Sequence, residues 1–171
     1  MDISTLSSFY NFLFVLFLIG LVVFVALYFV DAGYGKMRSD KWGPAINNKV
    51  GWCLMEMPVF MVMLYLWAIS DVKFQLPYLV FFLIFQFHYF QRSFIFPFLL
   101  KGNSKMPLVI MFFSMVWNLV NGYIQGYWLF HLAPVFAAHL YTPAWFSDPR
   151  FIVGVVIFVA GWIINMHSDH V

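Results

Sequence analysis

The sequence predicts an all-α integral membrane bundle with five transmembrane helices. Apolar residues make up 64% of the 171 residues and charged residues only 9%, and the mean hydropathy is +0.87. A soluble domain is about half apolar and about a quarter charged, so this composition indicates a chain that lies in a lipid bilayer. Five apolar segments, each close to the roughly 20 residues that a helix needs to cross the hydrocarbon core, give the number of spans.

The helices are expected, in chain order, at residues 9–30, 50–69, 76–100, 107–131 and 151–167. The first ends at a polar stretch with two glycines, and the second follows Gly43 and Pro44. Pro77 and Pro107 mark the starts of the third and fourth helices, and Pro143 lies in the break before the fifth, as expected for residues at helix boundaries. No repeat or soluble domain is visible, so the whole chain is expected to form a single transmembrane domain.

The distribution of lysine and arginine predicts the orientation in the membrane. The loops before the second and fourth helices contain six of these residues, namely Lys36, Arg38, Lys41, Lys49, Lys101 and Lys105. The other two loops contain only Lys73, and Arg150 at the start of the fifth helix is the one charge against the pattern. The two basic loops are therefore expected in the cytoplasm and the N-terminus outside, in the periplasm or the lumen of the endoplasmic reticulum. A net charge of +2 without a basic run argues against nucleic acid as a partner.

Glu56 is the only glutamate in the chain, and it lies inside the second apolar segment. An ionised carboxylate in hydrocarbon costs roughly 3 kcal/mol or more, so it persists only when it is paired, protonated or facing a polar cavity. Glu56 is therefore a candidate for a functional site. The alternative is a structural carboxylate that pairs with a lysine or arginine of a neighbouring helix.

Most other polar residues of the spans fall in the half of the membrane that we assign to the cytoplasm. They are Tyr34 and Lys36 after the first helix, Tyr89 and Arg92 in the third, Asn118, Asn121 and Gln125 in the fourth, and Asn165 and Asp169 in the fifth. Asn118, Asn121 and Gln125 have the spacing of one helix face. Unrelated polar residues would be divided between the two leaflets, so this clustering predicts one cavity that opens to the cytoplasm.

Glu56 and Tyr89 offer a carboxyl group and a phenol. In a dry pocket both can donate hydrogen bonds, polarise a carbonyl and stabilise the enolate that forms when hydride adds to a conjugated enone. By residue type alone, Tyr89 can equally be a tyrosine of the membrane interface. Arg92 and Lys36 can hold a phosphate-bearing cofactor, although lysines are also expected from the orientation pattern.

No metal site is expected. Cys53 is the only cysteine, and the five histidines are divided by the predicted topology between the two membrane faces. Asn165 and Asp169 can bind a ribose or a carboxamide, or they can simply cap the end of the fifth helix.

Five stretches together resemble the steroid 5α-reductase family, the 3-oxo-5α-steroid 4-dehydrogenases. They are GYGK at 33–36, WCLMEMP at 52–58, HYFQR at 88–92, NGYIQ at 121–125 and the closing segment DPRFIVGVVIFVAGWIINMHSDHV. A further similar run is FIFPFLLKG at 94–102. The similarity extends in order from about residue 34 to residue 171, and the combination of stretches is more specific than any one of them.

The resemblance implies an NADPH-dependent reductase of the Δ4 double bond of 3-oxo steroids, with hydride added to C5. Glu56 and Tyr89 then correspond to the pair that binds the C3 carbonyl. The residues assigned to the cofactor are Asn165, Asp169, Arg92, Tyr34 and Lys36. The residues assigned to the steroid are Trp52, Met55, Trp117 and Asn121.

The family has seven transmembrane helices, so the chain is expected to be the N-terminal portion of a longer reductase that needs the C-terminal helices to complete its cofactor site. We expect a monomer whose partners are a 3-oxo-Δ4 steroid substrate and the lipid bilayer. Three alternatives stay open from the residues alone: a sterol- or lipid-binding or transport module, a structural subunit of an assembly, and a related reductase of fatty enoyl or sterol double bonds.

Overall fold

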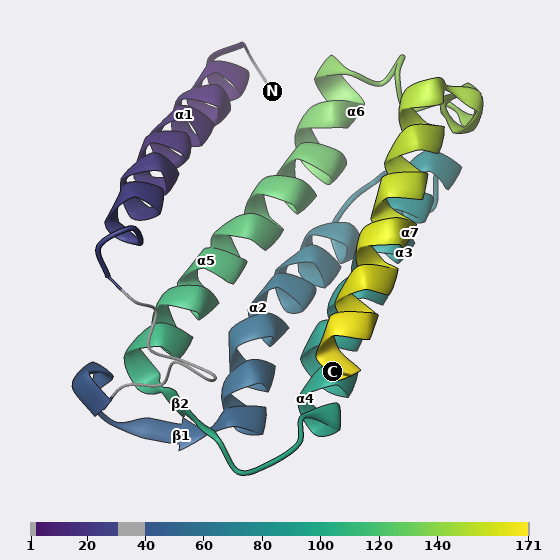
Figure 1. Cartoon of the computed structure of the whole chain (residues 1–171). Coiled ribbons are helices and arrows are strands. Elements are labelled where there is room, and N and C mark those ends of the chain that lie inside the picture. Colours follow the sequence, from purple (N-terminus) through teal and green to yellow (C-terminus); the bar gives the residue numbers. More distant parts are fainter. Residues whose placement is uncertain (1–2, 31–39, 171) are drawn as a thin grey trace.

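The computed structural model describes residues 3–30 and 40–170, and in this part of the chain five helices are long and apolar enough to cross a membrane (Figure 1). The prediction of an all-α membrane bundle with five such helices is confirmed. In chain order the helical elements are α1 (Ile3–Ala26), α2 (Asn48–Ala68), α3 (Leu76–Phe90), η3 (Gln91–Ile95), α4 (Phe96–Leu99), α5 (Leu108–Tyr127), η4 (Trp128–Leu132), α6 (Ala133–Phe136) and α7 (Pro149–His170). Two short 3₁₀ turns, η2 (Asp40–Trp42) and η5 (Pro143–Ser147), precede α2 and α7.

Two of the helix boundaries differ clearly from those expected. The first helix begins at Ile3 and ends at Ala26, where residues 9–30 were expected, because the polar N-terminal residues are already helical. The fourth span continues to Phe136 instead of stopping at 131, since the apolar sequence continues and its proline is accommodated in the helix. Apolar periodicity locates spans well but leaves their ends uncertain by a few residues.

The two basic loops are joined by a small sheet that the sequence analysis did not anticipate. Strand β1 (Ala45–Asn47) pairs antiparallel with β2 (Lys105–Pro107), with Ile46 opposite Met106 (Figure 1). The Asn47 side chain then begins α2, because its Oδ1 accepts a hydrogen bond from the Lys49 backbone N–H at 2.9 Å. The sheet therefore brings the starts of α2 and α5 together at one end of the bundle.

Helices α2 and α5 approach closely through two glycines one turn apart on α5. A Cβ atom on Gly122 would lie 2.9 Å from the Val59 carbonyl oxygen, and one on Gly126 would lie 2.7 Å from Cδ1 of Leu66. Small residues four positions apart allow the backbones of two membrane helices to pack closely. Such packing selects the partner helix, because lipid is as apolar as the helix surfaces and burial of apolar side chains gives little preference. This contact positions the polar face of α5 against α2.

Two π turns allow prolines to lie within the spans. Each turn, η3 and η4, ends just before a short helical segment that contains a proline, Pro97 in α4 and Pro134 in α6. Proline cannot donate to the carbonyl four residues earlier, which for Pro134 is Phe130. The hydroxyl of Ser70, at the end of α2, donates to that Phe130 oxygen at 3.2 Å. The π turn and the Ser70 hydroxyl together provide the hydrogen bonds that the proline cannot donate to the helix backbone.

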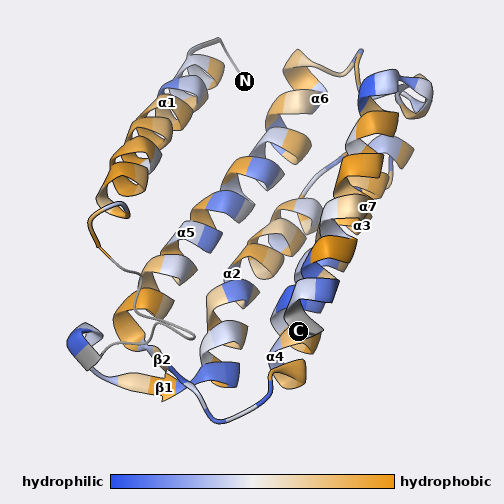
Figure 2. Ribbon diagram, in the orientation of Figure 1, coloured by the Kyte–Doolittle hydropathy of each residue, from blue (hydrophilic) through white to orange (hydrophobic). Residues whose placement is uncertain are grey.

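The core lies toward the end of the bundle away from the sheet. It is a cluster of buried residues from α2, α3 and the fourth span, with Met63, Tyr78, Phe82 and Phe130 among its members. Figure 2 shows that α1 is mostly hydrophobic, whereas α5 has hydrophilic positions along its middle. The long apolar surfaces suit contact with lipid, and the polar middle of α5 marks where the site is found.

Candidate functional site

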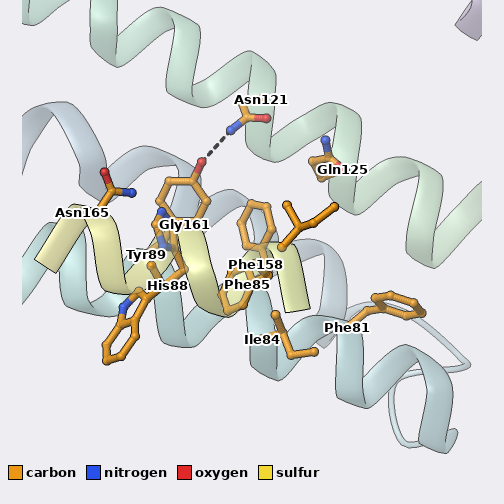
Figure 3. Close-up of a pocket in the computed structure, with 12 residues that line it drawn as sticks. Phe81, Ile84, Phe85, His88, Tyr89, Asn121, Gln125, Phe158, Gly161 and Asn165 are labelled. Atoms are coloured by element: carbon orange, nitrogen blue, oxygen red, sulfur yellow. Dashed lines mark hydrogen bonds between the residues drawn. The ribbon is translucent and has the colours of Figure 1, made fainter. Parts of the chain in front are cut away.

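A cavity of about 510 Å³ lies between α3, α5 and α7 (Figure 3). Its wall is formed by Phe81, Ile84, Phe85, His88, Tyr89, Asn121, Gln125, Ile157, Phe158, Gly161, Trp162 and Asn165. Ligand pockets are commonly of this size, about 300–1,000 Å³, and mostly apolar with a few directing polar groups. The cavity therefore suits a flat apolar molecule that has a polar end.

Tyr89 is the central polar group of this wall. Its hydroxyl oxygen accepts a hydrogen bond from Nδ2 of Asn121 on α5 at 2.8 Å (Figure 3). The Phe85 ring, one turn earlier on α3, packs against the tyrosine with the centroids 4.6 Å apart. Because the phenol oxygen already accepts the hydrogen bond from Asn121, the hydroxyl hydrogen can be donated to another acceptor.

Glu56 is buried on α2, with 9% of the residue exposed. Its Oε2 accepts from Nδ2 of Asn118 at 3.3 Å, and the same nitrogen donates to the Met55 carbonyl at 2.8 Å. Nη2 of Arg92 lies 3.8 Å from Oε1, which is longer than a hydrogen bond. The structural alternative foreseen for Glu56, a basic partner on a neighbouring helix, is therefore present as a loose ion pair with Arg92.

Arg92 lies in the π turn η3, and aromatic rings surround its guanidinium. Its Cζ is 4.3 Å from the centre of the Phe96 ring and 5.1 Å from that of Trp52. The two rings meet edge to face with centroids 5.1 Å apart. Cation–π contacts of this kind hold an arginine strongly when water is excluded. Trp52, Arg92 and Glu56 thus form one cluster on the α2 side.

The structure brings only some of the predicted site residues together in the cavity wall. Tyr89, Asn121 and Asn165 line the cavity. Five others lie outside its lining, namely Glu56, Arg92, Trp52, Met55 and Trp117. Met55 is buried in the bundle, whereas Trp117 is exposed on α5. No hydrogen bond joins Glu56 to Tyr89 in the described part of the chain, and the two are linked instead through neighbouring amides of α5.

For three predicted cofactor residues, the side chains lie outside the described part of the structure. Tyr34 and Lys36 lie outside the described residues. The backbone of Asp169 is part of α7, but its side chain is outside the described part. Their assignment to the cofactor stays a prediction.

Asn118 was expected in the polar cluster but without a role of its own, and His88 was not expected at the site. Asn118 contacts Glu56 directly, and its position three residues before Asn121 was the available signal. His88 lines the cavity beside Tyr89, and among the described residues its buried Nδ1 has no hydrogen-bond partner. A second cavity of about 350 Å³ shares Phe81, Phe85 and Gln125 with the first and continues toward Tyr141.

Comparison with known proteins identifies the relatives of this chain. A family model described as 3-oxo-5-alpha-steroid 4-dehydrogenase matches residues 104–171. The chain is 32% identical over 157 residues to 3-oxo-5-alpha-steroid 4-dehydrogenase 1 of Bos taurus, and 32% identical over 172 residues to steroid 5-alpha-reductase DET2 of Gossypium hirsutum. It is 35% identical over 151 residues to 3-oxo-5-alpha-steroid 4-dehydrogenase 2 of Sus scrofa.

By sequence, the chain is similar to the steroid 5-alpha-reductase family over most of its length. The three alignments cover 90%, 98% and 86% of the chain, in the same order, and 59%, 65% and 57% of the relatives. The chain thus spans somewhat more than half the length of these steroid 5-alpha-reductases. The matched family region contains Asn121 and Asn165, whereas Glu56 and Tyr89 precede it. The family resemblance expected from the sequence is confirmed.

Proposed function

We propose that this chain binds a 3-oxo-Δ4 steroid and activates its enone for NADPH-dependent reduction. The observation that supports this most directly is the Asn121–Tyr89 hydrogen bond in the cavity wall. It leaves the phenol hydrogen free to bind a carbonyl oxygen placed in the cavity. The apolar remainder of the wall suits the ring system of a steroid, and the relatives are named for reactions of such molecules.

In the proposed reaction Tyr89 donates a hydrogen bond to the C3 carbonyl oxygen. This bond draws electron density from the enone and makes C5 electrophilic, and it strengthens as negative charge develops on the oxygen. Glu56 is proposed as the second donor, from the α2 side, because it is the one acid buried near this wall among the described residues. The enolate that results takes a proton at C4.

One side chain of the cavity wall, that of Asn165, suits the carboxamide of a nicotinamide cofactor. The side chain of Asn165 is exposed on α7 and faces the cavity, where it can hydrogen-bond a carboxamide or a ribose (Figure 3). NADPH, when bound, supplies the hydride that adds to C5. We propose that Asn165 and Asp169 orient the cofactor, and that Arg92, Tyr34 and Lys36 contribute to its binding.

The proposal is tested by following NADPH consumption with progesterone or testosterone in detergent-solubilised protein. The chain is assayed alone and joined to the C-terminal portion of a relative. Steroid-dependent NADPH oxidation with formation of the 5α-reduced product supports the proposal. Tight steroid binding without reduction in both forms would indicate a sterol-binding module instead.

Glu56→Gln tests the second donor. The fold should persist, because glutamine keeps an oxygen that can accept from Asn118, while kcat should fall on the order of 10²-fold. Asp71→Asn makes the same chemical change in the α2–α3 loop and should leave turnover unchanged. Parent-like turnover of Glu56→Gln would assign Glu56 to a structural role beside Arg92.

A further inference from the structure

The amide of Asn118 has an orientation that its surroundings determine. Its Nδ2 lies 2.8 Å from the Met55 carbonyl oxygen and 3.3 Å from Oε2 of Glu56. A primary amide nitrogen has two hydrogens and no acceptor, so both hydrogens are used here. The flipped amide would place its oxygen against two acceptors. Asn118 therefore presents a donor, and only a donor, to Glu56.

This donor distinguishes the two carboxyl oxygens of Glu56. Oε2 accepts from Asn118, whereas the nearest Arg92 nitrogen lies 3.8 Å from Oε1, beyond hydrogen-bond distance. Oε1 is therefore the oxygen left to bind a ligand, and in the acid form it is the oxygen that can donate a hydrogen bond. The second hydrogen of the amide is bound to the carbonyl of Met55, the residue directly before Glu56. Asn118 thus links the Glu56 carboxyl group to the backbone of α2, the helix that contains Glu56.

The same arrangement recurs one turn along α5. Asn121 donates to the Tyr89 oxygen as Asn118 donates to Glu56. We propose that Asn118 is a positioning residue that holds Glu56 with Oε1 as its donating oxygen, in parallel with Asn121 and Tyr89. This inference rests on the proposed function, because it concerns the acid that is to polarise the substrate carbonyl.

Because Glu56 is the only glutamate in the sequence, labelling with carbon-13 glutamate gives a carboxyl signal from one site. Its infrared band or carboxyl resonance should shift in Asn118→Leu, which removes both donated bonds. The matched control is Gln86→Leu, which removes the bond from Nε2 of Gln86 to the Phe60 carbonyl of α2 at 3.3 Å without touching Glu56. An unchanged signal in Asn118→Leu, or an equal shift in both variants, overturns the inference.

Kinetics provide the second test, on whichever form of the protein is active. Asn118→Leu should lower kcat by roughly 10- to 100-fold through misplacement of Glu56, with KM changed by no more than about twofold. In the Glu56→Gln background the same change should cost almost nothing further, because both act through one group. Full additivity of the two losses would show that Asn118 acts independently of Glu56.

The outcomes separate this inference from the proposed function. Loss of turnover in Glu56→Gln with parent-like turnover in Asn118→Leu overturns the role of Asn118 and leaves the proposed function standing. Parent-like turnover in Glu56→Gln overturns the role of the acid itself, and the role of Asn118 with it. If Asn118→Leu does not fold, Asn118→Asp serves in its place, alone and with Glu56→Gln. The double change restores a donor and an acceptor between positions 56 and 118 but leaves the Met55 carbonyl without its donor, so it should recover part of the stability and none of the kcat.

Discussion

At the scale of single residues, the chemistry of the site depends on which atoms are already hydrogen-bonded. Tyr89 accepts from Asn121 and Glu56 accepts from Asn118, so each group retains its own proton for a ligand when it is in its acid form. Arg92, by contrast, lies against the rings of Phe96 and Trp52, which fixes its charge beside Glu56. The cation of the site therefore lies beside one of its two proposed donors, Glu56.

Removal of the Tyr89 hydroxyl should reduce turnover strongly. Tyr89→Phe keeps the ring against Phe85 but removes the proposed donor, so kcat should fall by about 10²-fold while the protein stays folded. Tyr123→Phe is the matched control, because Tyr123 contacts Phe12 of α1 and does not line the cavity. Rates of steroid reduction for the two variants check the prediction. An equal loss in both would point to a general effect of the substitution.

At the scale of elements, nearby residues of α5 have two structural roles, packing against α2 and contact with the side chains of the site. Its glycines bring the backbone against α2, and its amides then reach the acid of α2 and the phenol of α3. Close approach is needed because the asparagine side chain is short. The packing of this helix and the geometry of the site are therefore coupled.

Gly122→Ala should destabilise the bundle. The new Cβ would lie 2.9 Å from a backbone oxygen of Val59, which cannot move without shifting α2, so we expect a loss of about 1–3 kcal/mol in the free energy of unfolding. Gly154→Ala makes the same change in α7, where nothing lies within 4 Å, and it should be neutral or stabilising by up to about 1 kcal/mol. Thermal or denaturant unfolding in micelles measures both. Equal stability of the two variants would argue against the close α2–α5 contact.

The start of α7 should show a pH dependence at low pH. Hydrogen bonds from the side chain and backbone N–H of Arg150 lower the pKa of Asp148 to about 2. Since the pKa is lower than the unfolded value near 4, the stabilisation is present above pH 4 and is lost as the pH falls toward 2. Asp148→Asn should lack this dependence. Melting temperatures of the two proteins between pH 2 and 7 should therefore converge at the acidic end.

At the scale of the whole molecule, the β1–β2 pairing places the two basic loops at the same end of the bundle. The α2 end of the site, with Glu56 and Arg92, lies toward this sheet, and the aromatic core lies toward the other end. The prediction that the site opens to the cytoplasm therefore depends on which side of the membrane the two basic loops occupy.

This orientation can be tested with single cysteines in a Cys53→Ser background. Lys105→Cys, at the sheet, should react with a membrane-impermeant maleimide only after the membrane is permeabilised. Ser147→Cys, before α7, should react in intact cells or sealed vesicles with the outside exposed. The opposite pattern would place the N-terminus in the cytoplasm and the basic loops outside.

The sequence by itself determined the class of the protein and the number of its spans, since composition and helical periodicity are local properties of the chain. Its motifs also indicated the resemblance to a family. It also singled out Tyr89, Asn121 and Asn165, which line one cavity in the structure. What only the tertiary structure decided is which side chains meet. Asn118 reaches Glu56 from 62 positions away and Asn121 reaches Tyr89 from 32 positions away. Periodicity predicts which residues share a face of a helix, but it does not predict which helix packs against that face. For α5 the partner is set by the close packing of Gly122 and Gly126 against α2.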